Sequence, residues 1–154
     1  MSKNKDVAKA YKRKQIESAS PVELIILLYD GAIDFLNRAE KIYEPGKAES
    51  IEPFHKYLLA CQNIITELTV ALDMENGGEV AQKLFQLYEY INYSLVDINV
   101  TKRIEGIEEI RNLLQTLREG WVKLSENENQ EKASELAAKP EKKKNSGEGL
   151  NIQG

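Results

Sequence analysis

The sequence predicts an all-α protein: an antiparallel four-helix bundle with an N-terminal arm and a disordered, charged C-terminal tail. Only four prolines and nine glycines occur in 154 residues. Between them lie long stretches in which apolar residues recur with the period of an α-helix. Four such stretches with short connections are typical of an antiparallel bundle. The expected organisation is an arm over residues 1–19, a bundle over 20–125 and a tail over 126–154.

The first bundle helix has a strong start signal. Ser20 can cap the helix, Pro21 suits the first helical position, and Glu23 completes a capping box. We expect this helix to run to about Tyr43, where the Pro45-Gly46 turn follows.

The other three helices are bounded by similar signals. The second is expected over about 50–74, with Pro53 tolerated in its first turn, and Asn76-Gly77-Gly78 supplies a turn. The third is expected over 79–100. The fourth is expected over 103–125, with a single apolar seam as in a surface helix. The tail has few large apolar groups, so most of it is expected to be disordered.

Composition places the protein in the cytoplasm. No apolar run is long enough to span a membrane, and no apolar stretch follows the basic N-terminus as in a secretory signal. The single cysteine, Cys61, excludes an internal disulfide and fits a reducing compartment. We therefore expect a cytoplasmic protein without membrane insertion.

The net charge of −4 is unevenly distributed. Residues 1–14 hold six bases against Asp6, which leaves 15 bases and 24 acids in the remainder of the chain. An acidic body binds nucleic acid poorly, because phosphate neutralisation dominates that affinity. No nucleic-acid partner is expected. The basic arm could bind an anionic partner or fold back onto the acidic body.

The sequence lacks the signatures of an enzyme. Glu52 and His55 have the spacing used in di-iron bundles, but those sites need two such motifs and His55 is the only histidine. There is no Walker loop, no paired-cysteine zinc spacing and no nucleophile with a plausible base. We predict a non-enzymatic protein without a cofactor or metal, in which Cys61 is an inert core residue.

The second and third helices lack the charged outer face of a surface helix. Between Tyr57 and Leu72 the only charge is Glu67, and between Leu84 and Val96 the only charge is Glu89. A helical wheel assigns the core stripe of the second helix to Phe54, Leu58, Cys61, Ile65, Leu68 and Leu72. The stripe of the third consists of Val80, Leu84, Leu87, Tyr88, Ile91, Leu95 and Ile98.

The faces opposite these stripes are weakly polar or apolar. They consist of Leu59, Asn63, Thr66, Val70, Tyr90, Tyr93, Val96 and Val100. A four-helix bundle has no outer layer to bury them, so they must meet the arm, the tail, a second copy or a partner. Two interpretations stay open: permanent cover by the arm on an imperfect wheel, or a partner groove that the arm occupies occasionally.

A series of short motifs occurs in an order that is characteristic of one family. They are Tyr11, Gln15-Ile16-Glu17-Ser18-Ala19-Ser20-Pro21, Leu28-Tyr29-Asp30-Gly31, Gln62-Asn63-Ile64-Ile65-Thr66-Glu67-Leu68, Gly77-Gly78, Leu87-Tyr88-Glu89-Tyr90 and Leu117-Arg118-Glu119-Gly120-Trp121. The sequence thereby resembles the FliS family of flagellin-specific export chaperones. The resemblance ends before the tail.

This resemblance implies a chaperone that binds the C-terminal segment of flagellin, prevents its premature polymerisation and delivers it to a component of the flagellar type III export gate. It implies no cofactor, and a hydrophobic pocket covered by the arm through Tyr11. We expect Tyr11 and Ile16 to shield the groove between the second and third helices until flagellin displaces them. The alternative is a self-associating structural bundle without a flagellin client, in which the same surface is buried in a homodimer.

Overall fold

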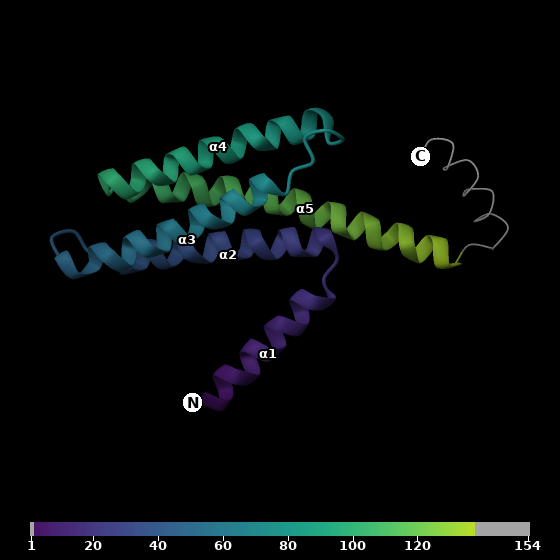
Figure 1. Cartoon of the computed structure of the whole chain (residues 1–154), viewed down its shortest axis with the longest axis horizontal. Coiled ribbons are helices and arrows are strands. Elements are labelled where there is room, and N and C mark those ends of the chain that lie inside the picture. The colour runs from purple at the N-terminus through teal and green to yellow at the C-terminus, as the bar shows by residue number, and fades with distance from the viewer. Residues whose placement is uncertain (1, 138–154) are drawn as a thin grey trace.

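The computed structural model of the chain describes residues 2–137, and its side chains over residues 6–130. These residues form five α-helices and one short 3-10 helix. Figure 1 shows how the α-helices are arranged. In chain order they are α1 (Ser2–Ser18), α2 (Pro21–Ile42), η1 (Ala48–Ser50), α3 (Ile51–Val70), α4 (Gly78–Thr101) and α5 (Glu105–Ala137). The described residues contain no strand.

Helices α2 to α5 form an antiparallel bundle in which each helix packs against two neighbours. Helix α2 contacts α3 and α5, and α4 completes the ring by contacting the same two helices. Helix α1 leaves this bundle at the end where α2 begins (Figure 1). The predicted fold class is confirmed, and the N-terminal arm is itself a helix.

The predicted capping box at the start of α2 is present. The backbone N–H of Glu23 donates to Ser20 Oγ at 3.2 Å, and the backbone N–H of Ser20 donates to Glu23 Oε1 at 2.8 Å. At the other end of the bundle, the buried Ser50 hydroxyl donates to the carbonyls of Glu44 and Lys47 and fixes the connection between α2 and α3.

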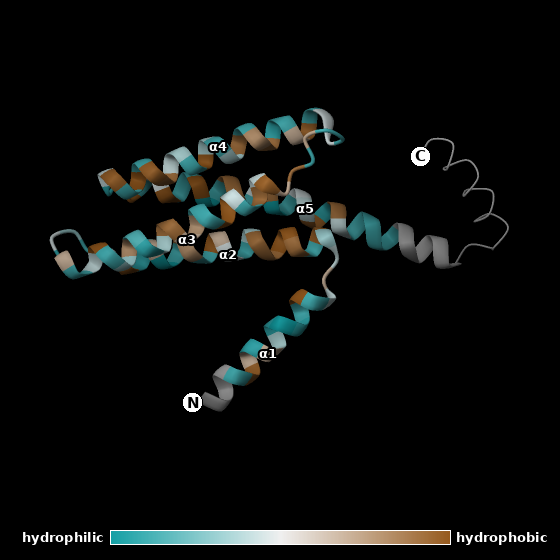
Figure 2. Ribbon diagram, viewed as in Figure 1, coloured by the Kyte–Doolittle hydropathy of each residue, from teal (hydrophilic) through white to brown (hydrophobic). Residues whose placement is uncertain are grey.

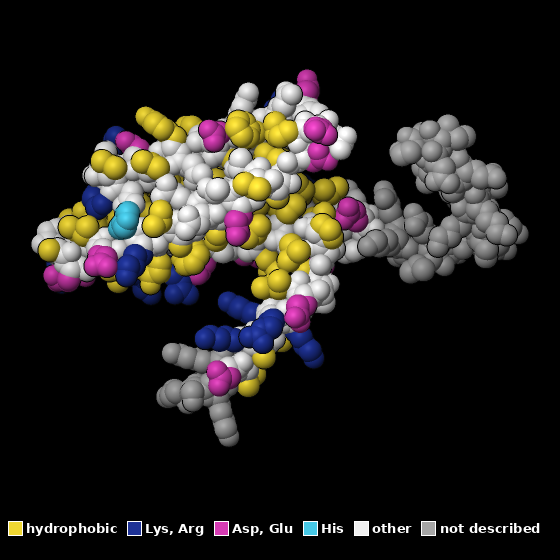
Figure 3. Space-filling model, viewed as in Figure 1, with side chains coloured by type: hydrophobic (Ala, Val, Ile, Leu, Met, Phe, Trp, Pro, Cys, Tyr) yellow, Lys and Arg dark blue, Asp and Glu magenta, His cyan; other side chains and the backbone are white. Residues whose placement is uncertain are grey.

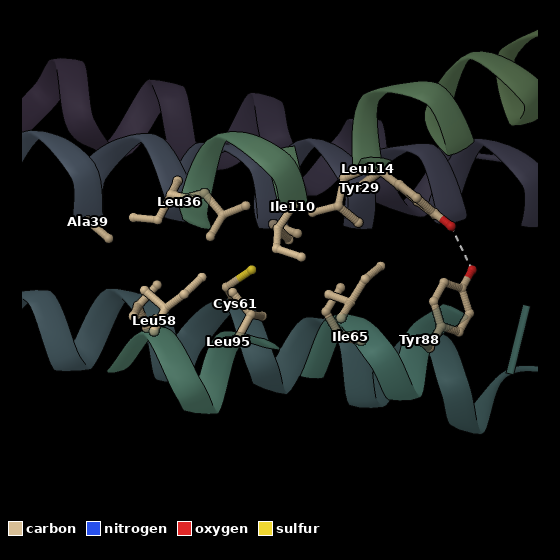
Figure 4. Close-up of a cluster of buried hydrophobic side chains, with 14 of the residues drawn as sticks. Tyr29, Leu36, Ala39, Leu58, Cys61, Ile65, Tyr88, Leu95, Ile110 and Leu114 are labelled. Carbon is tan, nitrogen blue, oxygen red and sulfur yellow. Dashed lines mark hydrogen bonds between the residues drawn. The ribbon is translucent and has the colours of Figure 1, made fainter. Parts of the chain in front are cut away.

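The core lies along the centre of the bundle and is formed by side chains of α2, α3, α4 and α5 (Figure 4). Its fully buried side chains include Tyr29, Leu36, Phe54, Leu58, Cys61, Ile65, Ile91, Leu95, Ile107, Ile110 and Leu114. The predicted stripe of α3 is confirmed, except that Leu72 lies just beyond the helix and is half-buried. Burial raises the pKa of the Cys61 thiol to about 12, so the thiolate that reacts is scarce at neutral pH.

The predicted stripe of α4 is wrong at its first position. Val80 is 67% exposed, whereas Ala81 is 4% exposed and belongs to the core side. Val80 lies in the first turn of α4, at the end of the bundle, where the tight Gly77-Gly78 turn sets the direction of the helix. The Gly78 φ of 59° fits the left-handed conformation expected of that turn.

Two predicted helix ends differ from the structure. Helix α3 ends at Val70 instead of near residue 74. Helix α5 continues to Ala137 instead of ending near residue 125, so the first part of the predicted disordered tail is helical. No glycine or proline occurs between Gly120 and Pro140, and good helix formers extend the helix after its apolar seam ends. Residues 138–154, where disorder was also predicted, lie outside the described residues.

None of the described helices has a stretch long and apolar enough to cross a lipid bilayer.

Candidate functional site

The candidate site is an exposed, weakly polar surface formed by neighbouring helices α3 and α4. On α3, Leu59 is 44% exposed and Val70 is 79% exposed, and Asn63 and Thr66 are also exposed. On α4, Val96 is 48% exposed and Val100 is 76% exposed. We call this set of residues the α3/α4 face: Leu59, Asn63, Thr66, Val70, Val96 and Val100.

The two helices are tied together by polar contacts beside this face. Asn92 Nδ2 of α4 donates to Thr66 Oγ1 of α3 at 3.3 Å. Towards the end of α4, Asn99 Nδ2 and His55 Nδ1 are 2.7 Å apart. The face is thus carried by two helices held in register rather than by a loop, so its shape is set before any partner arrives.

Apolar and uncharged polar side chains dominate the surface over α3 and α4. Figure 2 shows hydrophobic residues distributed along both helices, and Figure 3 shows yellow and white side chains over them with few charged ones. The nearest charges in sequence are Glu67, next to Thr66, and Asp97, next to Val96. Monomeric proteins seldom leave such a surface without a use, so it is the strongest candidate for a binding site.

Tyr90 and Tyr93 also lie on the outer side of α4, as the helical wheel predicted, with exposed fractions of 46% and 73%. Both line a groove between α4 and α5, and Tyr90 Oη donates to Glu109 Oε1 of α5 at 3.0 Å. We call this groove the acidic groove; its lining is Tyr90, Tyr93, Ser94, Asp97, Ile98, Arg103, Glu105, Gly106 and Glu109.

Tyr11 and Ile16 lie on α1, away from the α3/α4 face. Tyr11 is 71% exposed and Ile16 is 51% exposed. Gln15 and Ser18 of α1, together with Ala19 just beyond its end, border a hollow between α2 and α5. The structure therefore does not bring the arm over the α3/α4 face, and shielding of that face by the arm stays a prediction.

A small apolar pocket lies at the end of the bundle, and its lining residues could not be named from the sequence. It has a volume of about 190 Å³ and is lined mainly by Ile25, Leu68, Ala71, Leu72, Ala81, Leu84, Tyr88 and Trp121. The Tyr88 hydroxyl lies 2.6 Å from the Tyr29 hydroxyl, and burial raises the pKa of both tyrosines. Each lining residue is an ordinary core type, so only the three-dimensional packing reveals the hollow.

The buried Asn99 side chain is a second unpredicted feature. It is 9% exposed, and Lys102 Nζ donates to both its backbone carbonyl and its side-chain oxygen. Lys102 also lies over the Phe54 ring, with Nζ 5.4 Å from the ring centroid. The burial of Asn99 could have been predicted from the sequence, because Asn99 follows Leu95 at helical spacing on the core side.

The described side chains contain no group of three or more His, Cys, Asp or Glu residues that could hold a metal ion. His55, the histidine of the di-iron-like Glu52 and His55 pair, instead contacts Asn99. A helical bundle that carries an exposed, weakly polar face on two neighbouring helices is typical of a binding protein.

Comparison with known proteins identifies which kind of binding protein this is. The family described as flagellar protein FliS matches residues 3–128. The chain is 37% identical over 122 residues to the flagellar secretion chaperone FliS of Salmonella typhimurium, covering 76% of this chain and 88% of the relative. It is 34% identical over 111 residues to the flagellar secretion chaperone FliSB of Pseudomonas aeruginosa, covering 72% and 86%.

A solved structure supports the fold. A crystal structure of a bacterial flagellar chaperone superimposes with a TM-score of 0.63 at 22% identity, covering 80% of this chain and 98% of the other. The chain belongs to the FliS family. Members of this family are chaperones of flagellar secretion and not enzymes, which confirms the family resemblance and the prediction of a non-enzymatic protein.

Proposed function

We propose that this chaperone binds the C-terminal segment of flagellin on the α3/α4 face in the cytoplasm. Binding would prevent premature polymerisation of flagellin, and the complex would be delivered to a component of the flagellar type III export gate. The family membership supports a role in flagellar export, and the exposed apolar face supports a client with apolar surface of its own.

The observation that carries this proposal is that the α3/α4 face is surplus to folding. The core side chains of α3 and α4, such as Leu58, Ile65 and Leu95, are already fully buried. Val70 and Val100 nevertheless remain more than three-quarters exposed, at 79% and 76%. Covering them with a partner would stabilise the complex by roughly 25 cal/mol for each Å² of apolar surface removed from water.

The geometry of the face favours a helical client. Two antiparallel helices side by side form a shallow groove into which an amphipathic segment can lay its apolar side. A segment that is disordered alone would fold as it binds, so binding and helix formation are expected to occur together. Because the face has little charge, binding should depend only weakly on salt.

Tyr11 and Ile16 are proposed as additional client contacts. Both are exposed on α1, which is joined to α2 through the short non-helical Ala19-Ser20 connection. A client long enough to extend past the α3/α4 face could meet them at the end of the bundle where α2 begins.

The proposal is tested by titrating the chaperone with a peptide that covers the C-terminal segment of a cognate flagellin. We expect saturable one-to-one binding by calorimetry and a gain of helix by circular dichroism of the mixture. Asn63→Lys and Val96→Lys should each weaken binding by about tenfold or more, because a lysine would have to be desolvated in the apolar contact.

The matched control is Gln115→Lys, an exposed position on α5 outside the face. It adds the same charge and should leave the affinity unchanged. Absence of binding by the unaltered chaperone would contradict the flagellin proposal, while equal weakening by all three variants would show that the contact lies elsewhere.

A further inference from the structure

The basic helix α1 and the acidic groove have complementary charge and complementary apolar content, yet they cannot meet within one molecule. We propose that α1 of one copy binds in the acidic groove of a second copy, so that the client-free protein forms an arm-exchanged dimer. This inference concerns a surface between α4 and α5 and does not depend on flagellin binding to the α3/α4 face.

The acidic groove retains uncompensated negative charge. It contains Asp97, Glu105 and Glu109 against the single base Arg103, a net charge of −2. Arg103 pairs with Asp97, with 3.6 Å between Nη2 and Oδ2. Glu109 is contacted by the neutral Tyr90 hydroxyl, and Glu105 has no cationic partner among the described side chains.

The groove also offers an apolar contact. Tyr93 is 73% exposed and Tyr90 is 46% exposed, so ring surface is available beside the carboxylates. An aromatic or cationic side chain placed on these rings gains by stacking or by a cation–π contact. The groove therefore fits a segment that carries bases next to an aromatic residue.

Helix α1 is such a segment. Lys9, Lys12, Arg13 and Lys14 are all exposed, and none of the ion pairs between described side chains involves α1. Figure 3 shows this cluster of bases on the helix that projects from the bundle.

The bases of α1 stand beside an apolar strip. Val7 is 68% exposed and Tyr11, one turn later, is 71% exposed; both border a hollow together with Arg13 and Lys14. Tyr11 can pack on Tyr93 while the neighbouring bases approach Glu105 and Glu109.

Reach excludes the same contact within one copy. Arg111 lies two residues after Glu109 in α5 and donates to Glu40 Oε1 at 2.8 Å. The part of the groove around Glu109 is therefore level with Glu40 of α2. At about 1.5 Å per residue, Glu40 is about 28 Å along α2 from Pro21. Tyr11 is only about 10 Å from the Ser18 end of α1 and falls well short. The α1 helix of a second copy can reach the groove, because it is not tethered to this copy's α2.

Exchange of arms would be reciprocal, as in a closed twofold dimer, because each copy has one arm and one groove. The contact uses α1, α4 and α5 and leaves the α3/α4 face uncovered. It therefore differs from the self-associating bundle considered from the sequence, which buries that face.

The test is sedimentation velocity of the full chain over a series of concentrations. We expect a dimer fraction that rises with protein concentration and falls with added salt. Two charge-reversed variants probe the two sides: an arm variant, Lys12→Glu with Lys14→Glu, and a groove variant, Glu105→Lys with Glu109→Lys. Each should raise the dissociation constant of the homodimer by about tenfold or more, because like charges then face each other.

Mixing the two variants supplies the decisive measurement. The glutamates introduced in the arm of one variant can pair with the lysines introduced in the groove of the other, and the unchanged basic arm matches the unchanged acidic groove, so a heterodimer should form at concentrations where each variant alone is monomeric. Misfolding of either variant cannot imitate this recovery. The control variant, Lys41→Glu with Lys123→Glu, changes the net charge as the arm variant does, at exposed positions outside both surfaces, and should keep the dimer.

Several results would overturn the proposal. They are a monomer at every concentration, failure of the mixed variants to associate, or equal loss of the dimer in the control variant. A dimer that survives both charge reversals and is lost in Val96→Lys would show that copies meet through the α3/α4 face instead. Flagellin binding is measured separately, so failure of either proposal is recognised without the other.

Discussion

Tyr29 and Tyr88 form the most deeply buried polar contact of the core, with 2.6 Å between their hydroxyl oxygens (Figure 4). Their rings come from α2 and α4, helices that are not neighbours in the bundle, and the ring centroids are 6.5 Å apart. Buried hydroxyls need hydrogen-bond partners, and here the two hydroxyls pair with each other. This pair therefore joins opposite helices across the core and specifies their register.

Replacing one tyrosine of this pair should cost more than replacing both. Tyr88→Phe leaves the Tyr29 hydroxyl buried without this partner, and we expect a loss of about 1 to 3 kcal/mol in the free energy of unfolding. The Tyr29→Phe, Tyr88→Phe double variant removes both polar groups and should lie closer to the unaltered protein. Urea denaturation of the four proteins of this cycle gives the comparison; additive single effects would show that the hydroxyl contact contributes nothing.

At the same scale, the sequence predicted the direction of most side chains on α3 and α4 but not their neighbours. The wheel correctly put Leu59, Val96 and Val100 outside. It also put Tyr90 and Tyr93 outside, but it could not show that these rings line a groove together with residues of α5. A wheel gives an angle around one helix, whereas the neighbour at that angle depends on how the helices are arranged around the core.

Helix α5 illustrates how local sequence sets the stability of an element. Gly120 lies in its middle with no heavy atom within 4 Å of the position that a Cβ would occupy. We expect Gly120→Ala to raise the free energy of unfolding by about 0.5 to 1 kcal/mol, because alanine loses less backbone entropy on folding. Urea denaturation measures the change.

The control for this prediction is Gly46→Ala. Gly46 has a φ of 84°, which alanine adopts only with strain, so this variant should be destabilised by about 1 kcal/mol or more. Equal effects at the two positions would contradict the argument, since both have open space and differ mainly in backbone conformation and setting.

The ends of the elements were predicted well where a specific residue marks them. The Ser20-Pro21-Glu23 signal fixed the start of α2, because its hydrogen bonds involve only neighbouring residues. The end of α5 was predicted poorly, because the end of an apolar seam marks where packing stops and not where the helix stops. Whether a helix continues beyond its packing depends on the residues that follow.

In the whole molecule, stability and client binding should be separable. Val100 is 76% exposed, so Val100→Lys is expected to change the free energy of unfolding by less than about 0.5 kcal/mol. Ile65 is fully buried on the inner side of the neighbouring helix α3. Ile65→Ala should therefore lower the free energy of unfolding by about 2 to 5 kcal/mol. Urea denaturation of both variants, followed by flagellin-peptide titration of Val100→Lys, tests the separation.

We expect Val100→Lys to fold normally and to bind the peptide more weakly. Strong destabilisation by this variant would contradict the view that the outer side of α4 is surplus to folding. Normal folding with unchanged binding would place the client contact away from the end of α4.

The overall architecture was predictable because it follows from the period of apolar residues and from turn signals, both of which are local. The candidate site was predictable only in part. Missing charge on two helices revealed that a surface was unusual, but the position of α1 depends on a two-residue connection whose geometry no periodicity encodes. For the same reason the acidic groove, built from residues at the end of α4 and the start of α5, was not predicted.

The length of α5 has a consequence for how the molecule opens in solution. Trp121 is the last α5 residue packed against the core, and the helix continues to Ala137. An isolated helical segment of about 12 to 15 residues is marginal in water, so the distal part of α5 should unwind and rewind while the bundle stays closed. Its amide hydrogens should exchange with deuterium far sooner than those around Ile110 and Leu114. Uniformly slow exchange along α5 would reveal a cover on this segment beyond the contacts made by residues 2–137.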